Sequence, residues 1–149
     1  MNKSEALLAL ADQTDLLLFS YDLKKLRFNY LNHASEVFYK RMGESTPVDS
    51  IINFVHEEDR EYVKKSFTKV KEGFTLDEIE FRISPPGNAE KWLKLSAFLV
   101  NEQADEPMIV GHAENITEYK EVAAVLNKFS NKKNSILNIL SHDLANPLG

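Results

Sequence analysis

The segment that most constrains the fold is residues 117–146, which contain no glycine or proline. Side chains that favour burial recur along it at alternating steps of three and four residues, the spacing of a coiled-coil seam. The seam positions are Tyr119, Val122, Leu126, Phe129, Lys133, Ile136 and Leu140, with Lys133 as one polar interruption. We expect a long helix that pairs in parallel with a second copy; the alternative is an amphipathic helix packed on its own domain. The polar residues 130–135 are the candidate for a hinge or a local break.

The N-terminal part predicts a short helix followed by a hairpin. Residues 3–13 have a helical pattern, with Ser4 as the N-cap. The helix stripe would comprise Leu7, Leu8 and Ala11. A strand-like run at residues 16–21 and a polar turn at 22–25 follow. Beyond the turn, apolar and polar residues alternate with the period of a half-buried strand, which would place Leu26, Phe28 and Tyr30 inward.

The middle of the chain predicts helices. Residues 34–42 form one candidate helix, whose inward side chains would be Val37, Phe38 and Met42. One or two short turns are expected within residues 48–55. Residues 57–71 predict a better helix, because its first turn is acidic and its last turn is basic, as the helix dipole favours. Its buried stripe would be Val63, Phe67 and Val70.

Three strands are expected after this helix. Ile79, Phe81 and Ile83 alternate with charged residues, and a Pro-Pro-Gly-Asn turn reverses the chain. Residues 92–100 and 108–116 continue the meander. The order of strand, strand, helices and three strands predicts an α+β domain, a single antiparallel sheet with helices on one face.

Composition narrows the classes of function. The net charge of −5 gives no general attraction to nucleic acid or to acidic lipid. The absence of cysteine excludes disulfides, thiolate metal sites and cysteine nucleophiles. The longest apolar run, residues 16–19, is too short to span a membrane, and no signal peptide follows Met1. We therefore expect a cytoplasmic protein, unless a longer natural chain attaches it to a membrane.

Several local features resemble those of PAS domains, which share this element order. They are the run Phe-Val-His-Glu-Glu-Asp-Arg at residues 54–60, Trp92 early in a strand, and Gly111 in the last strand. Residues 114–117 resemble the Asp-Ile-Thr element that joins such domains to their effectors, with Asn115 in place of the aspartate. The resemblance implies a PAS fold, with a five-stranded antiparallel sheet, and a sensory role for residues 14–117.

The C-terminal segment resembles the phosphate-accepting region of two-component sensor histidine kinases. From Ser141 it reads Ser-His-Asp-Leu-Ala-Asn-Pro-Leu-Gly. The resemblance implies that His142 accepts a phosphoryl group from ATP and that Asp143 orients the histidine and accepts its proton. It also implies that Asn146 positions a water for dephosphorylating a response regulator. Ala145 departs from the family, where a basic residue is common at this position.

The helical spacing is compatible with this role for His142. It follows Leu140 of the seam by two positions, which corresponds to about 200° around the helix axis. His142 would therefore point away from a dimer core, toward a nucleotide domain or a receiver. Imidazole titrates near neutrality, so a nitrogen lone pair is available for attack on phosphorus.

The other histidines raise the alternative of a cofactor. Some PAS domains hold haem through an axial histidine, and His33, His56 and His112 are the candidates here. No pair of them has metal-ligand spacing, so we expect no metal site and favour structural roles. A cysteinyl-flavin adduct is excluded because the chain has no cysteine. A noncovalent flavin or a small metabolite in the PAS pocket stays open.

Together these features predict an N-terminal helix (1–13), a PAS sensor domain (14–117), a coiled-coil linker (118–134) and the start of a histidine-phosphotransfer helix (135–149). The expected function is the sensory half of a protein-histidine kinase that uses ATP and Mg²⁺. Expected partners are a second copy, a downstream nucleotide-binding domain and a response regulator. Lacking the nucleotide-binding motifs and the second bundle helix, this chain should be inactive alone. The alternative is a ligand- or cofactor-binding PAS module that acts by dimerisation without phosphotransfer.

Overall fold

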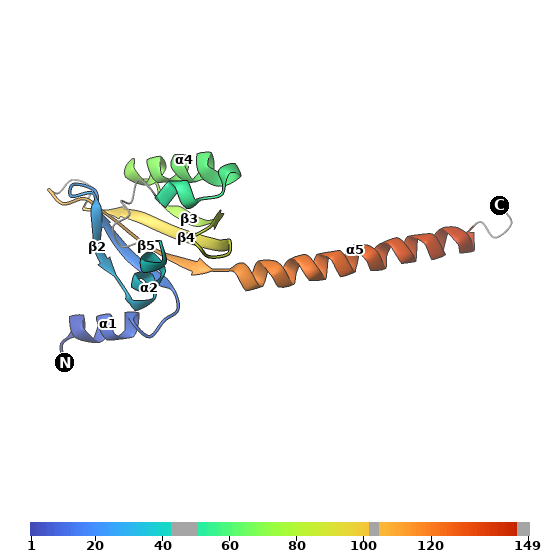
Figure 1. The fold of residues 1–149 in the computed structure, drawn as a ribbon, viewed down its shortest axis with the longest axis horizontal. Coiled ribbons are helices and arrows are strands. Elements are labelled where there is room, and N and C mark those ends of the chain that lie inside the picture. The colour runs from blue at the N-terminus through green and yellow to red at the C-terminus, as the bar shows by residue number, and fades with distance from the viewer. Residues whose placement is uncertain (43–50, 102–104, 146–149) are drawn as a thin grey trace. The chain divides into compact units, whose positions relative to one another are not determined.

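A computed structural model describes residues 1–42, 51–101 and 105–145 of the chain, with side chains up to His142. Two compact units are separated at a single point, one spanning Met1–Ile116 and the other Thr117–Gly149. Figure 1 labels most of the helices and strands of the two units. Among the described residues, none of the helices combines the length and the hydropathy that a membrane span requires.

The first unit contains helices and a five-stranded sheet. The helices are α1 (Lys3–Ala11), α2 (His33–Arg41) and α4 (Arg60–Lys71), with short 3-10 helices η1 (Ile52–Phe54) and η2 (Glu57–Asp59). The strands are β1 (Leu17–Asp22), β2 (Arg27–Leu31), β3 (Leu76–Ile83), β4 (Lys91–Val100) and β5 (Met108–Asn115). The second unit is the helix α5 (Thr117–Ala145).

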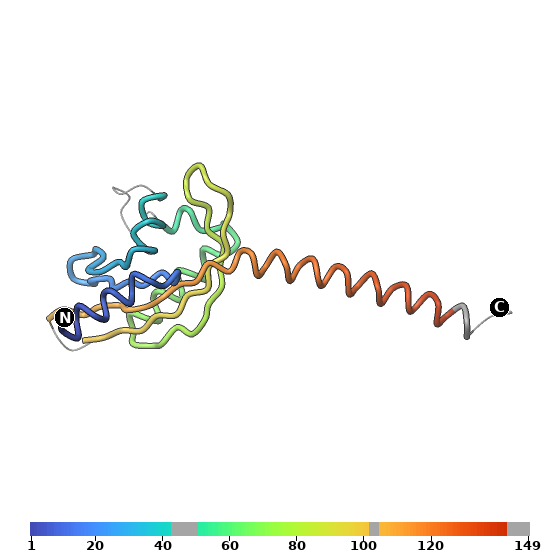
Figure 2. Tube along the Cα trace, turned by 90° about the horizontal axis from the view of Figure 1, so that it is seen from below, coloured from blue at the N-terminus to red at the C-terminus, as the bar shows by residue number. Residues whose placement is uncertain are grey.

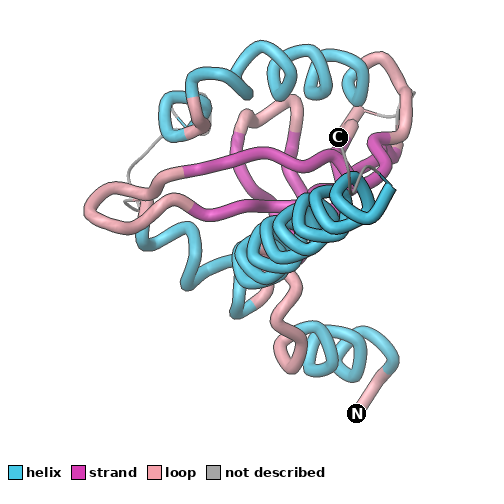
Figure 3. The backbone as a smooth tube through the Cα atoms, turned by 90° about the vertical axis from the view of Figure 1, so that its right-hand side faces the viewer, coloured by secondary structure: helices cyan, strands magenta, loops and turns pink. Residues whose placement is uncertain are grey.

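The sheet has the strand order β2-β1-β5-β4-β3, and every neighbouring pair is antiparallel. The last strand in sequence, β5, is therefore the central strand in space. Helix α4 lies over one face of the sheet, where it contacts β3 and β4, and α2 contacts β1 and β2 (Figure 3). This arrangement confirms the predicted α+β class and the predicted five-stranded antiparallel sheet.

The core lies between that face of the sheet and the helices. Its buried side chains include Tyr21, Met42, Val55, Val70, Ile79, Phe81, Ile83, Leu93, Ala97 and Ile109. The alternation predicted for β3 is confirmed, because its burial alternates from Ile79 to Ile83. The predicted hairpin turn is also present: the Asp22 carboxylate accepts hydrogen bonds from the backbone N–H groups of Lys24 and Lys25, each at 2.9 Å.

Asn32 is a buried polar residue that joins three elements. Its side-chain nitrogen donates to the carbonyl oxygens of Ala11 and Leu16, each at 2.9 Å. Its side-chain oxygen accepts from the N–H groups of Leu18 (3.1 Å) and Ser35 (3.0 Å). Both amide donors and both lone pairs are thus used, and the residue is 0% exposed. Asn32 therefore fixes the end of α1, the start of β1 and the N-terminus of α2 relative to one another.

Several expectations for single residues were wrong. The N-cap of α1 is Asn2 instead of Ser4, because Asn2 Oδ1 accepts from the Glu5 N–H at 2.8 Å. The predicted stripe of α1 is not buried: Leu7 and Leu8 are exposed, and the helix has no buried residue. Leu26 is also exposed, because it adopts a φ of 54° in the turn before β2 begins.

Two helical expectations also need correction. Val37 is exposed on α2, whereas Ser35 is buried because its hydroxyl donates to the Leu18 carbonyl oxygen at 2.8 Å. The polar residues 130–135 do not break the C-terminal helix, which runs continuously through Thr117–Ala145 (Figure 2). Asparagine, serine and lysine at these positions lower helix propensity by only a few tenths of a kcal/mol each, which does not outweigh the flanking turns.

Candidate functional site

A cavity of about 400 Å³ lies within the first unit, between the sheet and the helices. The sheet contributes an apolar floor, and α2, η1 and α4 contribute the walls. Two small residues, Ala97 of β4 and Ala113 of β5, line the cavity. Gly111, two residues before Ala113 on β5, pairs with Ala97 on one side and with Phe19 on the other.

Gly111 has no room for a side chain. A Cβ atom added there would lie 2.9 Å from both the Ala97 Cβ and the Phe19 ring, and would overlap the Ser96 carbonyl oxygen. The strand therefore requires glycine at this position for close approach to β4 and to the Phe19 ring. This gives a physical reason for the last-strand glycine that the sequence singled out.

Aromatic rings form one wall of the cavity. Phe28 contacts three of them edge to face, with centroid distances of 5.5 Å to Tyr21, 5.4 Å to Tyr39 and 6.1 Å to Phe19. Tyr21 also contacts Phe67 of α4 at 6.4 Å. Such edge-to-face pairs resist sliding, so the rings connect β1, β2, α2 and α4 around the cavity.

The cavity offers a ligand few polar groups. Both serine hydroxyls in its lining already donate to backbone carbonyl oxygens, Ser35 to Leu18 and Ser66 to Tyr62, each at 2.8 Å. Among the described lining residues, Lys64 is the one with a charged side chain, and it is exposed. Burying an uncompensated polar ligand group here would be costly.

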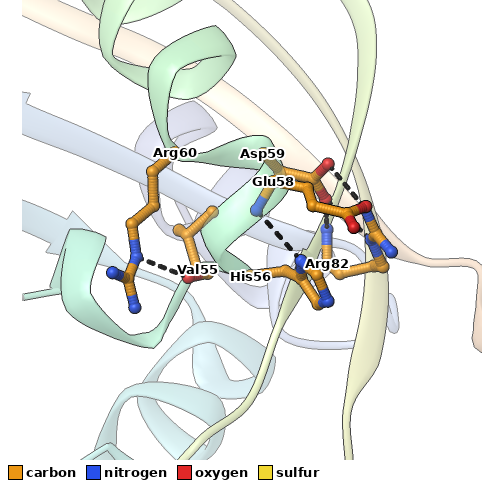
Figure 4. A network of polar contacts seen from close by, with 6 residues as sticks. All are labelled: Val55, His56, Glu58, Asp59, Arg60 and Arg82. Atoms are coloured by element: carbon orange, nitrogen blue, oxygen red, sulfur yellow. Dashed lines mark hydrogen bonds and ion pairs between the residues drawn. The ribbon is translucent and has the colours of Figure 1, made fainter.

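A polar network connects the run at residues 54–60 to the sheet (Figure 4). The Asp59 carboxylate accepts three hydrogen bonds from Arg82 of β3: from the backbone N–H, from Nε and from Nη2, each at 2.9 Å. Arg82 also pairs with Glu58 at 3.1 Å. Arg60 donates to the carbonyl oxygens of Val55 and Asn53, each at 3.0 Å. These contacts fix η1 and η2, and with them the cavity wall, against β3.

Charge pairing shifts the pKa values within this network. The side-chain hydrogen bond from Arg82 holds the pKa of Asp59 below its ordinary value, which outweighs the opposing effect of burial. The same bond raises the pKa of Arg82. The acidic turn was predicted from the sequence, but its partner Arg82 was not, because Asp59 and Arg82 lie far apart in the chain. The alternation of β3, which places Arg82 between two inward residues, was the available signal.

The three candidate haem ligands are outside the cavity lining that the structure describes. His33 is the first residue of α2, where its backbone N–H donates to the Asp12 carboxylate at 2.9 Å. His56 caps η2, with Nδ1 accepting from the Glu58 N–H at 3.1 Å. His112 is exposed on β5. Across the described ranges, no group of three or more His, Cys, Asp or Glu side chains could hold a metal ion.

The predicted phosphorylation site lies near the end of α5. His142 is exposed and helical, and Asp143 continues the helix. His142 is two positions after Leu140, so the two residues are about 200° apart around the axis. Asn146 and Pro147 lie outside the described residues. The structure thus places His142 and Asp143 on one continuous helix with the predicted seam.

The seam itself is exposed in the single chain. Leu126 is 60% exposed and Phe129 67%. The other apolar seam positions, Tyr119, Val122, Ile136 and Leu140, are each more than half exposed or at 50%. Val125, Leu137 and Ile139 add exposed apolar area beside them. A row of exposed apolar side chains of this length is unusual on a monomer.

No family model matches the chain, and no curated protein matches its sequence. Solved structures do match its fold. A sensory box histidine kinase/response regulator from Burkholderia thailandensis is 17% identical, with a TM-score of 0.62 over 90% of this chain and 99% of that one. The N-terminal domain of a diguanylate cyclase with a PAS/PAC sensor, from Marinobacter aquaeolei, is 15% identical, with a TM-score of 0.57 over 70% and 98%.

An RNA-binding light-oxygen-voltage receptor is also similar, at 13% identity and a TM-score of 0.64 over 89% of this chain and 38% of that one. These similarities and the strand order show that the chain has a PAS fold, as predicted. The neighbours' names differ in their outputs: histidine kinase, diguanylate cyclase and RNA binding. The fold alone therefore does not determine the output of this chain.

Proposed function

We propose that this chain is the sensory half of a two-component histidine kinase, in which the PAS domain controls phosphorylation of His142. The observation that carries the proposal is the continuous helix α5. A single residue, Ile116, separates this helix from β5. The helix carries the exposed seam, and it contains His142 of the Ser-His-Asp-Leu-Ala-Asn-Pro motif. Neither a PAS fold nor a His-Asp pair would support this function alone.

The central position of β5 supports a route for the signal. Ile109 and Ala113 of this strand line the cavity, and Ile116 N–H, just before α5, donates to the Trp92 carbonyl oxygen at 2.9 Å. A ligand that displaces β5 would also displace Ile116, the residue that directly precedes α5. Two copies joined through the seam would convert that displacement into a change in helix pairing.

Phosphoryl transfer at His142 would proceed by in-line attack. A neutral imidazole nitrogen forms a bond to the terminal phosphorus of ATP, the bond from that phosphorus to the bridging oxygen breaks, and ADP leaves. The proton on the ring passes to Asp143, the role that the family resemblance gives this residue. The phosphoryl group would next pass from the His142 nitrogen to an aspartate carboxylate of a response regulator, which frees the imidazole. In the separate phosphatase reaction, Asn146 would position a water that attacks the phosphorus of this aspartyl phosphate, releasing inorganic phosphate and the free carboxylate.

The test uses the full-length gene product that carries this chain, with ATP labelled on the terminal phosphate. We expect acid-labile, alkali-stable label on the wild type and none on His142→Gln. His112→Gln is the matched control, because His112 is also exposed but lies on the sheet, and it should label normally. Absence of label from a folded protein that binds ATP would contradict the proposal.

A module that dimerises without phosphotransfer is the second candidate. It is favoured by the range of outputs named for similar folds, among them an RNA-binding receptor. Here His142 would be a surface residue, and His142→Gln would leave every output unchanged. The same labelling experiment separates the two functions, with the oligomeric state measured by light scattering in parallel.

A further inference from the structure

The sensory cavity and the helix beside it differ sharply in charge. The whole chain has a net charge of −5. Helix α4, in contrast, carries Arg60, Lys64, Lys65, Lys69 and Lys71 against a single acidic residue, Glu61. The cavity interior is apolar and its serine hydroxyls are already bonded. An apolar interior beside a cationic helix is complementary to a ligand with one apolar and one anionic end.

We propose that the cavity binds a medium-chain carboxylate, with the hydrocarbon chain inside and the carboxylate at Lys64. This inference rests on the proposed sensory function, because it names the class of ligand that the PAS domain would sense.

Lys64 lies where the cavity meets solvent. Its side chain belongs to the cavity lining and is exposed. Phe67, one turn further along α4, also belongs to the lining and is 38% exposed. Lys71, one turn beyond Phe67, places its Nζ 4.8 Å from the Phe67 ring centroid. Residues three and four apart share one helix face, so Lys64, Phe67 and Lys71 form a cationic edge around an aromatic ring.

The interior favours a hydrocarbon chain over a polar cofactor. The deep lining includes Leu76, Ile79, Phe81, Leu93, Leu95 and Ile109. A flavin or a nucleobase needs several hydrogen bonds along its ring edge, and unpaired ring atoms would lose affinity here. A volume of about 400 Å³ also lies in the lower part of the range for small-molecule sites. An alkyl chain needs no hydrogen bonds.

Chain length and head group give separate predictions. Each buried methylene should tighten binding by roughly fourfold until the cavity is full. The head group should rank decanoate above decanol and decanol above decylamine, because Lys64 attracts an anion and repels an ammonium.

The experiment measures binding of these three ligands to the 149-residue chain by calorimetry, below their micelle-forming concentrations. Lys64→Glu should weaken decanoate at least tenfold and leave decanol within about twofold. Lys65→Glu is the matched control, since Lys65 is the next residue on α4 but is outside the lining, and should change decanoate by less than threefold. Ala97→Leu, which fills the floor of the cavity, should abolish binding of both decanoate and decanol.

Three outcomes would overturn the proposal. They are equal affinity for decanoate and decylamine, equal effects of Lys64→Glu and Lys65→Glu, and no decanoate binding to the folded wild type. If Ala97→Leu fails to fold, the lysine pair still decides the result. Because binding is measured without ATP, a failure here leaves His142 labelling unaffected. A failure of His142 labelling likewise leaves the binding result intact.

Discussion

The helices α4 and α5 both carry apolar residues at helical spacing, yet these residues have opposite environments. On α4, Val70 is 1% exposed because the helix packs on the sheet within the same unit, although Phe67 of the predicted stripe is 38% exposed. On α5, the seam residues stay exposed in the single chain, and Phe129 reaches 67%. Apolar periodicity therefore identifies the apolar face of a helix, but it does not show that this face is buried. It does not show whether the covering surface belongs to the same chain.

The largest effect should come from the residue that holds the first unit together. We expect Asn32→Ala to lower the free energy of unfolding of that unit by about 3 kcal/mol, because it leaves buried donors and acceptors unpaired and removes the α2 N-cap. Urea unfolding followed by Trp92 fluorescence measures this. Asn29→Ala, on the exposed face of β2, should cost less than about 0.5 kcal/mol. Comparable losses for the two variants would contradict the role given to Asn32.

A charge in the seam should disturb only the second unit. We expect Leu126→Asp to weaken dimerisation about a hundredfold, because it places a carboxylate in each copy at a buried, like-charged position. Ala124→Asp is the control, two residues away and about 200° around the helix. Sedimentation equilibrium measures the dimer and Trp92 fluorescence reports the first unit, which should unfold unchanged. Equal weakening by both variants would remove the seam from the interface.

Packing at the centre of the sheet gives the next effect. Gly111→Ala should destabilise the first unit by about 2 kcal/mol, because the added Cβ meets the Ser96 carbonyl oxygen and the Phe19 ring. Gly87→Ala separates this clash from backbone strain, since Gly87 has a φ of 71° but open space around it. We expect about 1 kcal/mol for Gly87→Ala, from strain alone. The opposite ranking in urea unfolding would show that β5 can shift to admit a side chain.

The smallest effect concerns the Asp59–Arg82 pair, and it depends on pH. Asp59→Asn should cost about 1 kcal/mol at neutral pH, since both side chains are largely buried and the bond is charge-assisted. Glu58→Gln, at an exposed partner of the same arginine, should cost less than about 0.5 kcal/mol.

The sign of the pH dependence follows from the lowered pKa of Asp59. The folded state keeps this carboxylate ionised more strongly than the unfolded state does. The stabilisation is therefore present above the ordinary aspartate pKa and is lost as the pH falls through the folded-state pKa. Unfolding free energies of wild type and Asp59→Asn should converge on acidification. A constant difference across the acid range would assign the effect to packing instead of charge.

Sequence patterns predicted the elements better than the contacts between them. The alternation at Ile79–Ile83 directly predicted a strand, because one face of β3 packs on the core. The stripe predicted for α1 was wrong, since its leucines have helical spacing but are exposed. Low helix propensity at residues 130–135 suggested a break that α5 does not have. Polar side chains are tolerated there because they project from the helix without breaking backbone hydrogen bonds.

The contacts that pattern reasoning missed are long-range and polar. Asn32 reads as an ordinary residue before a helix, and its bonds to Ala11 and Leu16 depend on how the chain folds back. The Asp59–Arg82 pair is likewise distant in the chain, because α4 and most of β3 lie between the two residues. For the candidate site, the sequence singled out Gly111 but neither Ala97 nor Ala113. That Gly111 lies opposite Ala97, and that Ala97 and Ala113 line one cavity, depends on strand register, which a single sequence does not determine.

The continuous helix from Thr117 to His142 also constrains how this region tolerates insertions and deletions. Removing one residue would turn His142 by about 100° relative to the first turn of α5, whereas removing seven would restore the helical phase to within about 20°. Seven residues shorten the helix by only about 10 Å. Under the proposed function, linker length would therefore vary in whole heptads. A chimaera that joins this PAS domain to the catalytic part of a kinase should be active only when the linker keeps the helical phase.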